Sequence, residues 1–296
     1  MTTQNKNIFY ILLFLAMWAW GASWVNIKII SEYINEYETM FFRFAFTALT
    51  MIPIIIILKK SFVLSIRNLF WIFLTSLAMI AYMKYFYLGT KLGTASLGGA
   101  FVTSLIPINT FLILALLNKK MITKKDSFAL ILGAVGVMTI LNIWSFKSEE
   151  IFLYQNLYFI LAAIFWPIVT ILSSKALKIS PIVFTFYLYI TCSILNIIFF
   201  VDLSNVEYEK FDSLFWINMT ALILLASTFA NTIYFLGIER LGAKEVSSFI
   251  FLVPFAAITL SAIFLDEQIS FSIVIGTILT LSAVKILNNI KIFKKS

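Results

Sequence analysis

The sequence predicts an all-α integral membrane protein with ten transmembrane helices, arranged as two inverted five-helix repeats. Three observations support this prediction: the composition, the number of long apolar segments, and the return of first-half motifs in the second half. Of the 296 residues, 61% are hydrophobic and only 12% are charged. A chain with so little polar surface does not dissolve as a monomer, whereas a lipid bilayer accommodates it.

Apolar windows of about 20 residues, the length that crosses the hydrocarbon core of a bilayer, fit along the chain ten times. We expect spans at residues 8–30, 39–58, 68–89, 95–118, 127–144, 154–174, 182–201, 214–237, 245–265 and 271–290. The first window is too long and too rich in Trp for a cleaved signal peptide, so we expect it to remain as a span.

Short motifs of the first half return in the same order in the second half. The clearest case is residues 92–95 (LGTA) with 105–107 (LIP), against 241–244 (LGAK) with 252–254 (LVP). A repeat with an odd number of spans enters its second copy from the other side of the membrane, which produces an inverted repeat. We therefore expect two repeats that form one domain, at residues 1–148 and 149–296.

The charges favour one orientation in the membrane. If the amino terminus is cytoplasmic, most of the 22 Lys and Arg residues fall inside, and only Lys91, Lys147 and Lys210 fall in external loops. This agrees with the positive-inside rule. The net charge of +8 is spread over short loops, so we expect no nucleic-acid partner. We expect a multi-pass protein of the cytoplasmic (inner) membrane with both termini in the cytoplasm.

Two residue types that commonly serve enzymes are scarce. The chain has no His and one Cys, Cys192, which removes the commonest general base, the commonest metal ligand and any thiolate cluster. No nucleophile–base constellation is recognisable either. We therefore expect no enzymatic activity, no metal and no cofactor.

An ordered set of motifs resembles the EamA branch of the drug/metabolite transporter superfamily. The set comprises residues 20–23 (WGAS) with Lys28, residues 43–44 (RF), the segments from Gly93 to Pro107 and from Gly242 to Pro254, and residues 266–270 (DEQIS) leading to Gly276. The resemblance covers nearly the whole chain and implies a ten-helix bundle of two inverted five-helix repeats. Lys120 and Ala129 depart from the family's usual Glu and Gly, differences that concern topology or packing.

Three cations lie within predicted spans at a similar depth near the external side: Lys28, Arg43 and Lys84. An ionisable group near the bilayer centre costs about 2.5 to 3.5 kcal/mol, so a retained one suggests function. These groups can bind a substrate carboxylate, and Arg43 offers a bidentate fork. Alternatively, Lys28 extends to the interface and Arg43 pairs with Glu36 or Glu38 as a structural contact.

No Asp or Glu lies in the middle of a predicted span. Proton coupling through a buried carboxylate is therefore unsupported. The same absence favours a neutral, zwitterionic or anionic substrate over a polycationic one.

Aromatic, amide and hydroxyl side chains complete the candidate site, because ligand pockets are mainly apolar with a few placed polar groups. Besides Arg43 and Lys84, we expect substrate contacts from Trp20, Asn26, Tyr82, Thr103, Asn109, Trp166, Asn231, Tyr234 and Ser248. Core packing, interfacial belts and helix-to-helix hydrogen bonds are the competing roles. Pro107 and Pro254 recur at equivalent repeat positions, where we expect either hinges or static kinks.

The resemblance and the cationic, aromatic spans together lead to a functional expectation. The protein is expected to be a secondary transporter that exports amino acids or related zwitterionic or anionic metabolites by alternating access. A flippase for lipid-linked headgroups, an exporter or importer of drugs or cationic metabolites, and a partner subunit without transport activity remain as alternatives. The expected partners are a small-molecule substrate and the lipid bilayer, with the chain as a monomer or homodimer.

Overall fold

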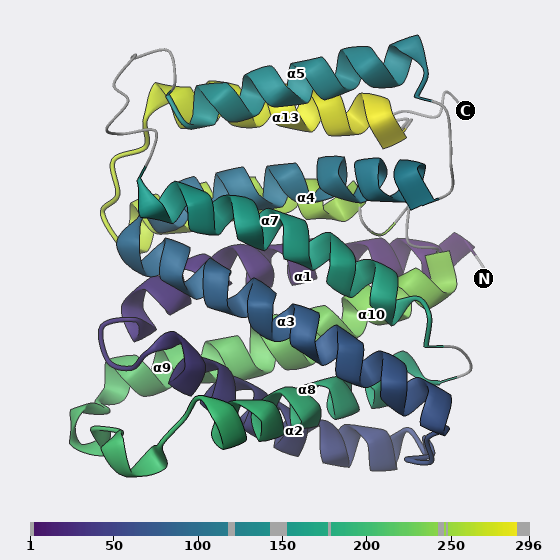
Figure 1. Ribbon diagram of the computed structural model, residues 1–296, viewed down its shortest axis with the longest axis vertical. Helices are drawn as coiled ribbons and strands as arrows, with labels where there is room; N and C mark the ends of the chain where they lie inside the picture. The colour runs from purple at the N-terminus through teal and green to yellow at the C-terminus, as the bar shows by residue number, and fades with distance from the viewer. Residues whose placement is uncertain are drawn as a thin grey trace.

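Helices are the only regular secondary structure in the part of the chain that the computed structural model describes, residues 3–117, 122–142, 153–176, 179–241, 246 and 248–288. They run across the view in Figure 1 as a stack of neighbouring rods. In chain order they are α1 (Thr3–Ile30), α2 (Glu36–Ile57), α3 (Ile66–Leu92), α4 (Ala95–Leu117), α5 (Lys124–Ile140), α7 (Tyr154–Ser173), α8 (Pro181–Phe199), η2 (Leu203–Asn205), η3 (Tyr208–Lys210), α9 (Ser213–Ala221), η4 (Leu222–Asn231), α10 (Thr232–Leu241), η5 (Ser248–Leu252), α12 (Val253–Phe264) and α13 (Phe271–Asn288).

Each of the ten windows placed from the sequence contains a helical segment. Among the described residues, seven helices are long and apolar enough to cross a membrane: α1, α2, α3, α4, α7, α8 and the continuous rod α9–η4–α10. Helices α12 and α13 are apolar but contribute shorter segments, and α5 has 17 residues. The chain is therefore an all-α, multi-pass membrane protein, because helices satisfy their backbone hydrogen bonds internally in lipid.

Local sequence explains where several helices begin. At the start of α2, the Asn35 side chain accepts the backbone N–H groups of Tyr37 and Glu38, and the Glu38 carboxylate accepts the Asn35 N–H at 2.9 Å. Thr123 and Asp126 form the same capping box at α5. Such boxes satisfy N–H groups that lack a partner within the helix.

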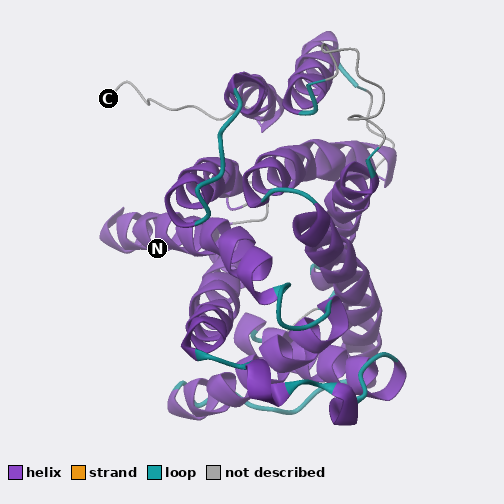
Figure 2. Ribbon diagram, turned by 90° about the vertical axis from the view of Figure 1, so that its left-hand side faces the viewer, coloured by secondary structure: helices purple, strands orange, loops and turns teal. Residues whose placement is uncertain are grey.

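The two halves pack through corresponding helices. α2 contacts α8, α4 contacts α12, and α5 contacts α13. Other contacts also come in matched pairs. The contact of α3 with α7 corresponds to the contact of the rod α9–η4–α10 with α1, and the contact of α1 with α12 corresponds to the contact of α7 with α4. Exchanging the halves therefore returns the same packing pattern. The α5–α13 pair forms the upper end of the bundle in Figures 1 and 2.

Small residues bring α12 close to its neighbours. A Cβ added to Gly21 of α1 would collide with Ala256, and one added to Gly99 of α4 would collide with Ala257. Close approach through small residues is the usual basis of helix association in membranes, where no hydrophobic effect drives it. It locks α12 between α1 and α4.

The rod α9–η4–α10 contains a π-helix, η4, that the sequence did not predict. Its ten residues follow the i→i+5 pattern, and the Thr228 hydroxyl also donates to the carbonyl of Ile223, five residues earlier, at 2.8 Å. π-helical segments are rare and frequently occur at functional sites. Here the segment carries three polar side chains, Ser227, Thr228 and Asn231, that bond to other helices.

The start of α1 and the end of α13 lie on the same side of the bundle. α1 begins and α13 ends at the right of Figure 1. On that side, the described connections carry Lys59, Lys60 and Lys175, and Arg67 lies in the first turn of α3. On the opposite side, the connections that the structure describes carry one cation, Lys210, among Glu32, Asp202, Glu207, Glu209, Asp212, Asp266 and Glu267. The two faces of the bundle therefore differ in the sign of their charge.

Candidate functional site

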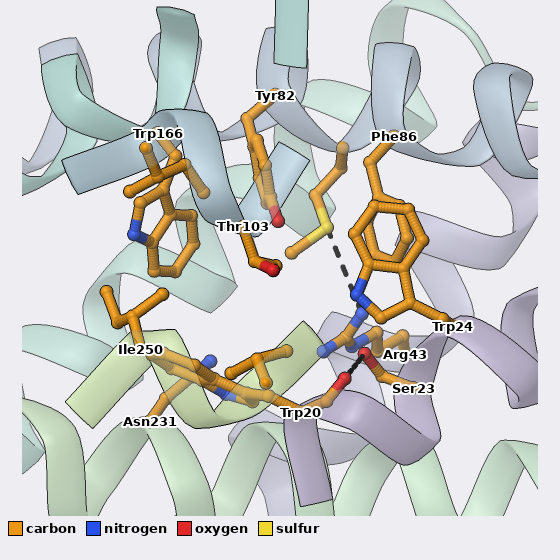
Figure 3. A pocket seen from close by; sticks show the side chains of 13 residues that line it. Trp20, Ser23, Trp24, Arg43, Tyr82, Phe86, Thr103, Trp166, Asn231 and Ile250 are labelled. Atoms are coloured by element: carbon orange, nitrogen blue, oxygen red, sulfur yellow. Dashed lines mark hydrogen bonds between the residues drawn. The ribbon is translucent and has the colours of Figure 1, made fainter. Parts of the chain in front are cut away.

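A small cavity lies between the two halves of the chain, and both halves line it (Figure 3). The lining side chains come from α1 to α4, α7, η4, η5 and α12: Trp20, Ser23, Trp24, Arg43, Tyr82, Met83, Phe86, Thr103, Ile106, Trp166, Asn231, Ile250 and Val253. Its volume is about 40 Å³. Since one water occupies about 10 to 15 Å³ by this measure, the cavity holds about three waters.

Arg43 is the only charged group among these lining residues, and it is 3% exposed. Its Nε donates to Ser227 Oγ at 2.7 Å, and its Nη1 donates to Tyr87 OH at 2.9 Å and to Met83 Sδ at 3.9 Å. Within the described chain no carboxylate pairs with it, and Glu38 serves its own helix cap. A buried cation that is held only by neutral groups is costly.

A hydrogen-bond chain holds Trp20 in place. The indole Nε1 of Trp20 donates to Asn231 Oδ1 at 2.8 Å and to the carbonyl of Ala226 at 3.1 Å. The Asn231 amide in turn donates to the Tyr189 hydroxyl. These bonds link α1, η4 and α8. They fix the Trp20 ring as the floor of the cavity in Figure 3.

Aromatic rings form most of the remaining wall. Trp166 meets Trp20 at 5.5 Å between ring centroids and 84° between planes, and it meets Tyr82 at 4.7 Å and 55°. Trp24 packs on Phe86 at 4.1 Å and 55°. The rings therefore meet at steep angles, in the tilted or edge-to-face arrangements that their quadrupoles favour.

The structure brings together most of the aromatic and polar side chains expected from the sequence. Those that line the cavity are Trp20, Arg43, Tyr82, Thr103, Trp166 and Asn231. Tyr234 packs behind the floor, with its ring 4.9 Å from Trp20 and 6.4 Å from Trp166.

Three other expected contacts, Lys84, Asn109 and Asn26, do not line this cavity. Lys84 faces α2, with its ammonium 5.5 Å from the Tyr37 ring, and the Asn109 amide donates to the carbonyl of Ala163 at 2.8 Å, which ties α4 to α7. Asn26 is partly exposed on α1, and the Ser248 side chain lies outside the described residues. The Asn109 bond is a helix-to-helix hydrogen bond, which is the role that competes with substrate binding at this position.

The two prolines, which occupy equivalent repeat positions, lie in different local structure. Pro107 is inside the continuous helix α4, whereas Pro254 lies in the first turn of α12, directly after the 3₁₀ segment η5. The first turn tolerates proline because an N–H there has no intrahelical partner. Each proline deprives the carbonyl four residues earlier of its α-helical donor. Those residues, Thr103 and Ile250, both line the cavity.

Some lining residues were not among the expected contacts, notably Ser23, Trp24, Met83 and Phe86. Helical spacing would have found them. Residues three and four positions apart share a helix face, so Ser23 and Trp24 follow from Trp20, and Phe86 follows from Tyr82. Ser227, which holds Arg43, depends on the π-helix and carries no comparable signal.

On the acidic face of the bundle, hydrogen bonds from other helices and connections hold the α3–α4 connection in place. Lys28 Nζ donates to the carbonyls of Lys91 and Gly93 at 2.9 and 2.8 Å. Glu267 accepts the backbone N–H groups of Ala95 and Ser96 at 2.8 and 2.9 Å. Helix carboxyl ends attract cations and amino ends attract carboxylates, so both bonds hold this connection, and Glu267 joins the two halves.

The basic face is more open. A hollow of about 1060 Å³ lies among the ends of α2, α7 and α10 and the start of α8. Phe235 lines this hollow and packs on Phe184 at 5.9 Å and on Tyr234 at 5.7 Å. Tyr234 in turn packs on the cavity floor. The side chains of Tyr234 and Phe235 therefore separate the hollow from the cavity.

A cavity with an aromatic wall and a few polar groups, between two matched halves of a membrane helical bundle, is typical of secondary transporters. Residues 7–142 and 153–289 each match the EamA-like transporter family. The chain belongs to this family, which confirms the resemblance noted in its motifs. The family points to a membrane transporter rather than an enzyme.

Two further comparisons agree with this assignment. The chain is 24% identical over 284 residues to the uncharacterized transporter YetK of Bacillus subtilis (strain 168), a match that covers 90% of this chain and 82% of YetK. A solved structure described only as "Crystal structure of protein" has a TM-score of 0.67 at 15% identity, over 95% of this chain and 96% of the other. At this identity the likeness shows the fold alone.

Proposed function

We propose that the protein is a secondary transporter that exports small zwitterionic or anionic metabolites, amino acids or related compounds, across the cytoplasmic membrane. The observation that carries the proposal is Arg43, a buried cation that lines the cavity between the halves and has no carboxylate partner among the described residues. A substrate carboxylate supplies the missing charge and two acceptor oxygens for the guanidinium. A cationic drug would meet Arg43 as a like charge.

Alternating access through this cavity is the proposed mechanism. The contacts of Lys28 and Glu267 close the acidic side, and Tyr234 with Phe235 separates the cavity from the hollow on the basic side. In the proposed cycle the substrate enters when the aromatic barrier opens, and it leaves when the contacts on the acidic side break. Rocking of one repeat against the other around a fixed site is the usual form of such a cycle.

The proposed topology has ten spans in two inverted repeats with both termini in the cytoplasm. Support comes from the ten helical segments, the matched packing of the halves and the basic side of the bundle, which the positive-inside rule places inside. The cytoplasmic face then carries the connection with Lys60, and the external face carries the equivalent connection of the second half, with Glu209.

Cysteine labelling directly tests whether the two repeats have inverted orientations in the membrane. We expect a membrane-impermeant maleimide to label Glu209→Cys in intact cells and Lys60→Cys only after permeabilisation, because the two exposed positions follow the second helix of each repeat. Background is low since Cys192 is the one cysteine and is buried. Labelling of both positions from the same side would contradict the inverted arrangement.

Flux in proteoliposomes tests the transport proposal. We expect saturable exchange of zwitterionic or carboxylate-bearing solutes that does not respond to an imposed pH gradient, because the described residues that line the cavity include no carboxylate to carry a proton. Choline, a cation without a carboxylate, is the matched negative probe. Choline flux alone, or flux that requires a proton gradient, would contradict the proposal.

A further inference from the structure

We propose that the cavity is built for betaine-type zwitterions, compounds in which a short carbon chain joins a carboxylate to a fully N-methylated ammonium group. This inference rests on the proposed transport function and names the class of substrate. The inference combines two features of the cavity. One is an aromatic corner formed by three rings, and the other is the buried guanidinium of Arg43 on the opposite side.

The corner consists of Trp20, Trp166 and Tyr82. The Trp20 and Trp166 planes are inclined by 84° and the Tyr82 and Trp166 planes by 55°, so the three rings form adjoining walls rather than parallel plates. A planar ring is best held between parallel faces, whereas a compact, rounded cation is best held by inclined faces that surround it. Aromatic cages for quaternary ammonium groups have this second form.

The carboxylate end of such a ligand has a separate partner. Figure 3 shows Arg43 and Trp166 on opposite sides of the cavity, with Trp20 on the floor between them. A dipolar molecule that lies across the floor places its carboxylate at Arg43 and its onium group in the aromatic corner. The separation also keeps the onium charge away from the guanidinium, which would repel it.

Full methylation of the ammonium matters because the lining residues include no carboxylate that could pair with an N–H donor. A primary ammonium is strongly hydrated and brings N–H donors that need acceptors, yet no carboxylate is among the lining residues. The acceptors in the lining are neutral: the hydroxyl oxygens of Ser23 and Thr103, which donate to the carbonyls of Trp20 and Gly99 and keep their lone pairs, and the carbonyls of Thr103 and Ile250. Neutral acceptors replace the hydration of a primary ammonium less well than a carboxylate does. A trimethylammonium group has no donor to satisfy and interacts with the ring faces alone.

Four small probes test the inference with the purified full-length protein: glycine betaine, its uncharged-headgroup isostere 3,3-dimethylbutanoate, glycine and choline. Binding is measured by thermal shift and transport by competition against flux in proteoliposomes. We expect glycine betaine to bind at least about tenfold more tightly than each of the other three, because only it uses both ends of the cavity. Equal competition by glycine betaine and its isostere, or tighter binding of glycine, would overturn the inference.

Variants of the corner add a readout that a general loss of structure would not give. We expect Trp166→Leu to weaken glycine betaine at least about fivefold while 3,3-dimethylbutanoate changes little, since an apolar wall remains but the ring quadrupole is lost. Trp166→Phe should restore part of the preference. Equal weakening of both probes by Trp166→Leu would contradict the cage.

The failure of this inference is distinguishable from failure of the transport proposal. Flux of zwitterions without any preference for the methylated headgroup would contradict the aromatic cage and support the transport proposal. Tight, Trp166-dependent binding of glycine betaine without flux of any solute would support the aromatic cage and contradict the transport proposal.

Discussion

Replacement of Arg43 by methionine is expected to weaken the apparent affinity for zwitterionic and anionic substrates by more than about tenfold. Truncating one partner of a buried, hydrogen-bonded charge pair typically costs about 2 to 5 kcal/mol, and Arg43 is the only cation among the described residues that line the cavity. The measurement is concentration-dependent uptake into proteoliposomes. Arg43→Lys should recover part of the loss, because it keeps the charge but not the planar fork.

The fold is expected to survive the Arg43→Met change. Removing a buried charge that has no carboxylate partner also removes its desolvation cost, and apolar replacements of buried charges are often neutral for stability. Lys84→Met provides the matched control, since Lys84 is a membrane-depth cation that faces Tyr37 instead of the cavity. If Lys84→Met abolishes uptake and Arg43→Met does not, the carboxylate site has been assigned to the wrong cation.

Replacement of Gly276 by alanine is expected to destabilise the protein through the α5–α13 contact. A Cβ at this position would lie 2.5 Å from the carbonyl oxygen of Gly136 and 2.6 Å from the backbone nitrogen of Ile140. Backbone atoms cannot rotate away, so the helices must separate, and overpacking of this kind costs about 1 to 3 kcal/mol. Thermal unfolding in detergent measures the effect as a lower midpoint.

Ile278→Ala is the control on the same helix. The Ile278 side chain is 53% exposed at the outer surface of the bundle, so we expect a much smaller change in the unfolding midpoint. An unchanged midpoint for Gly276→Ala would show that α5 and α13 are not in backbone contact.

Much of the architecture was predictable because lipid imposes simple rules on a sequence. Each span must be a long apolar helix, and all ten predicted windows contain helices. The family assignment was also predictable, since motifs such as 92–95 and 241–244 are short, ordered and repeated. The positions of individual side chains around each helix axis were less certain, because nearly uniform apolar composition hides which face is buried.

The site was predictable in part, and the reasons for success and failure differ. Trp20, Arg43, Tyr82, Thr103, Trp166 and Asn231 could be expected because aromatic and polar groups in apolar spans are costly or bulky enough to suggest a role. Lys84 was expected for the same reason, yet it faces α2. Depth in the membrane can be read from spacing along the chain, but direction around the helix depends on how α3 packs.

The composition, the ten apolar windows and the internal repeat by themselves determined that this protein is an all-α, multi-pass membrane protein, and its ordered motifs carried the resemblance to a transporter family. Tertiary packing alone decided which cation lines the cavity, that Asn231 holds Trp20 in place, and that the rod between α9 and α10 adopts a π-helix which presents Ser227 to Arg43. The physical reason is that partition into lipid depends on summed side-chain hydrophobicity, which is local in sequence. The cavity depends on contacts such as Arg43 with Ser227, which join residues far apart in the chain.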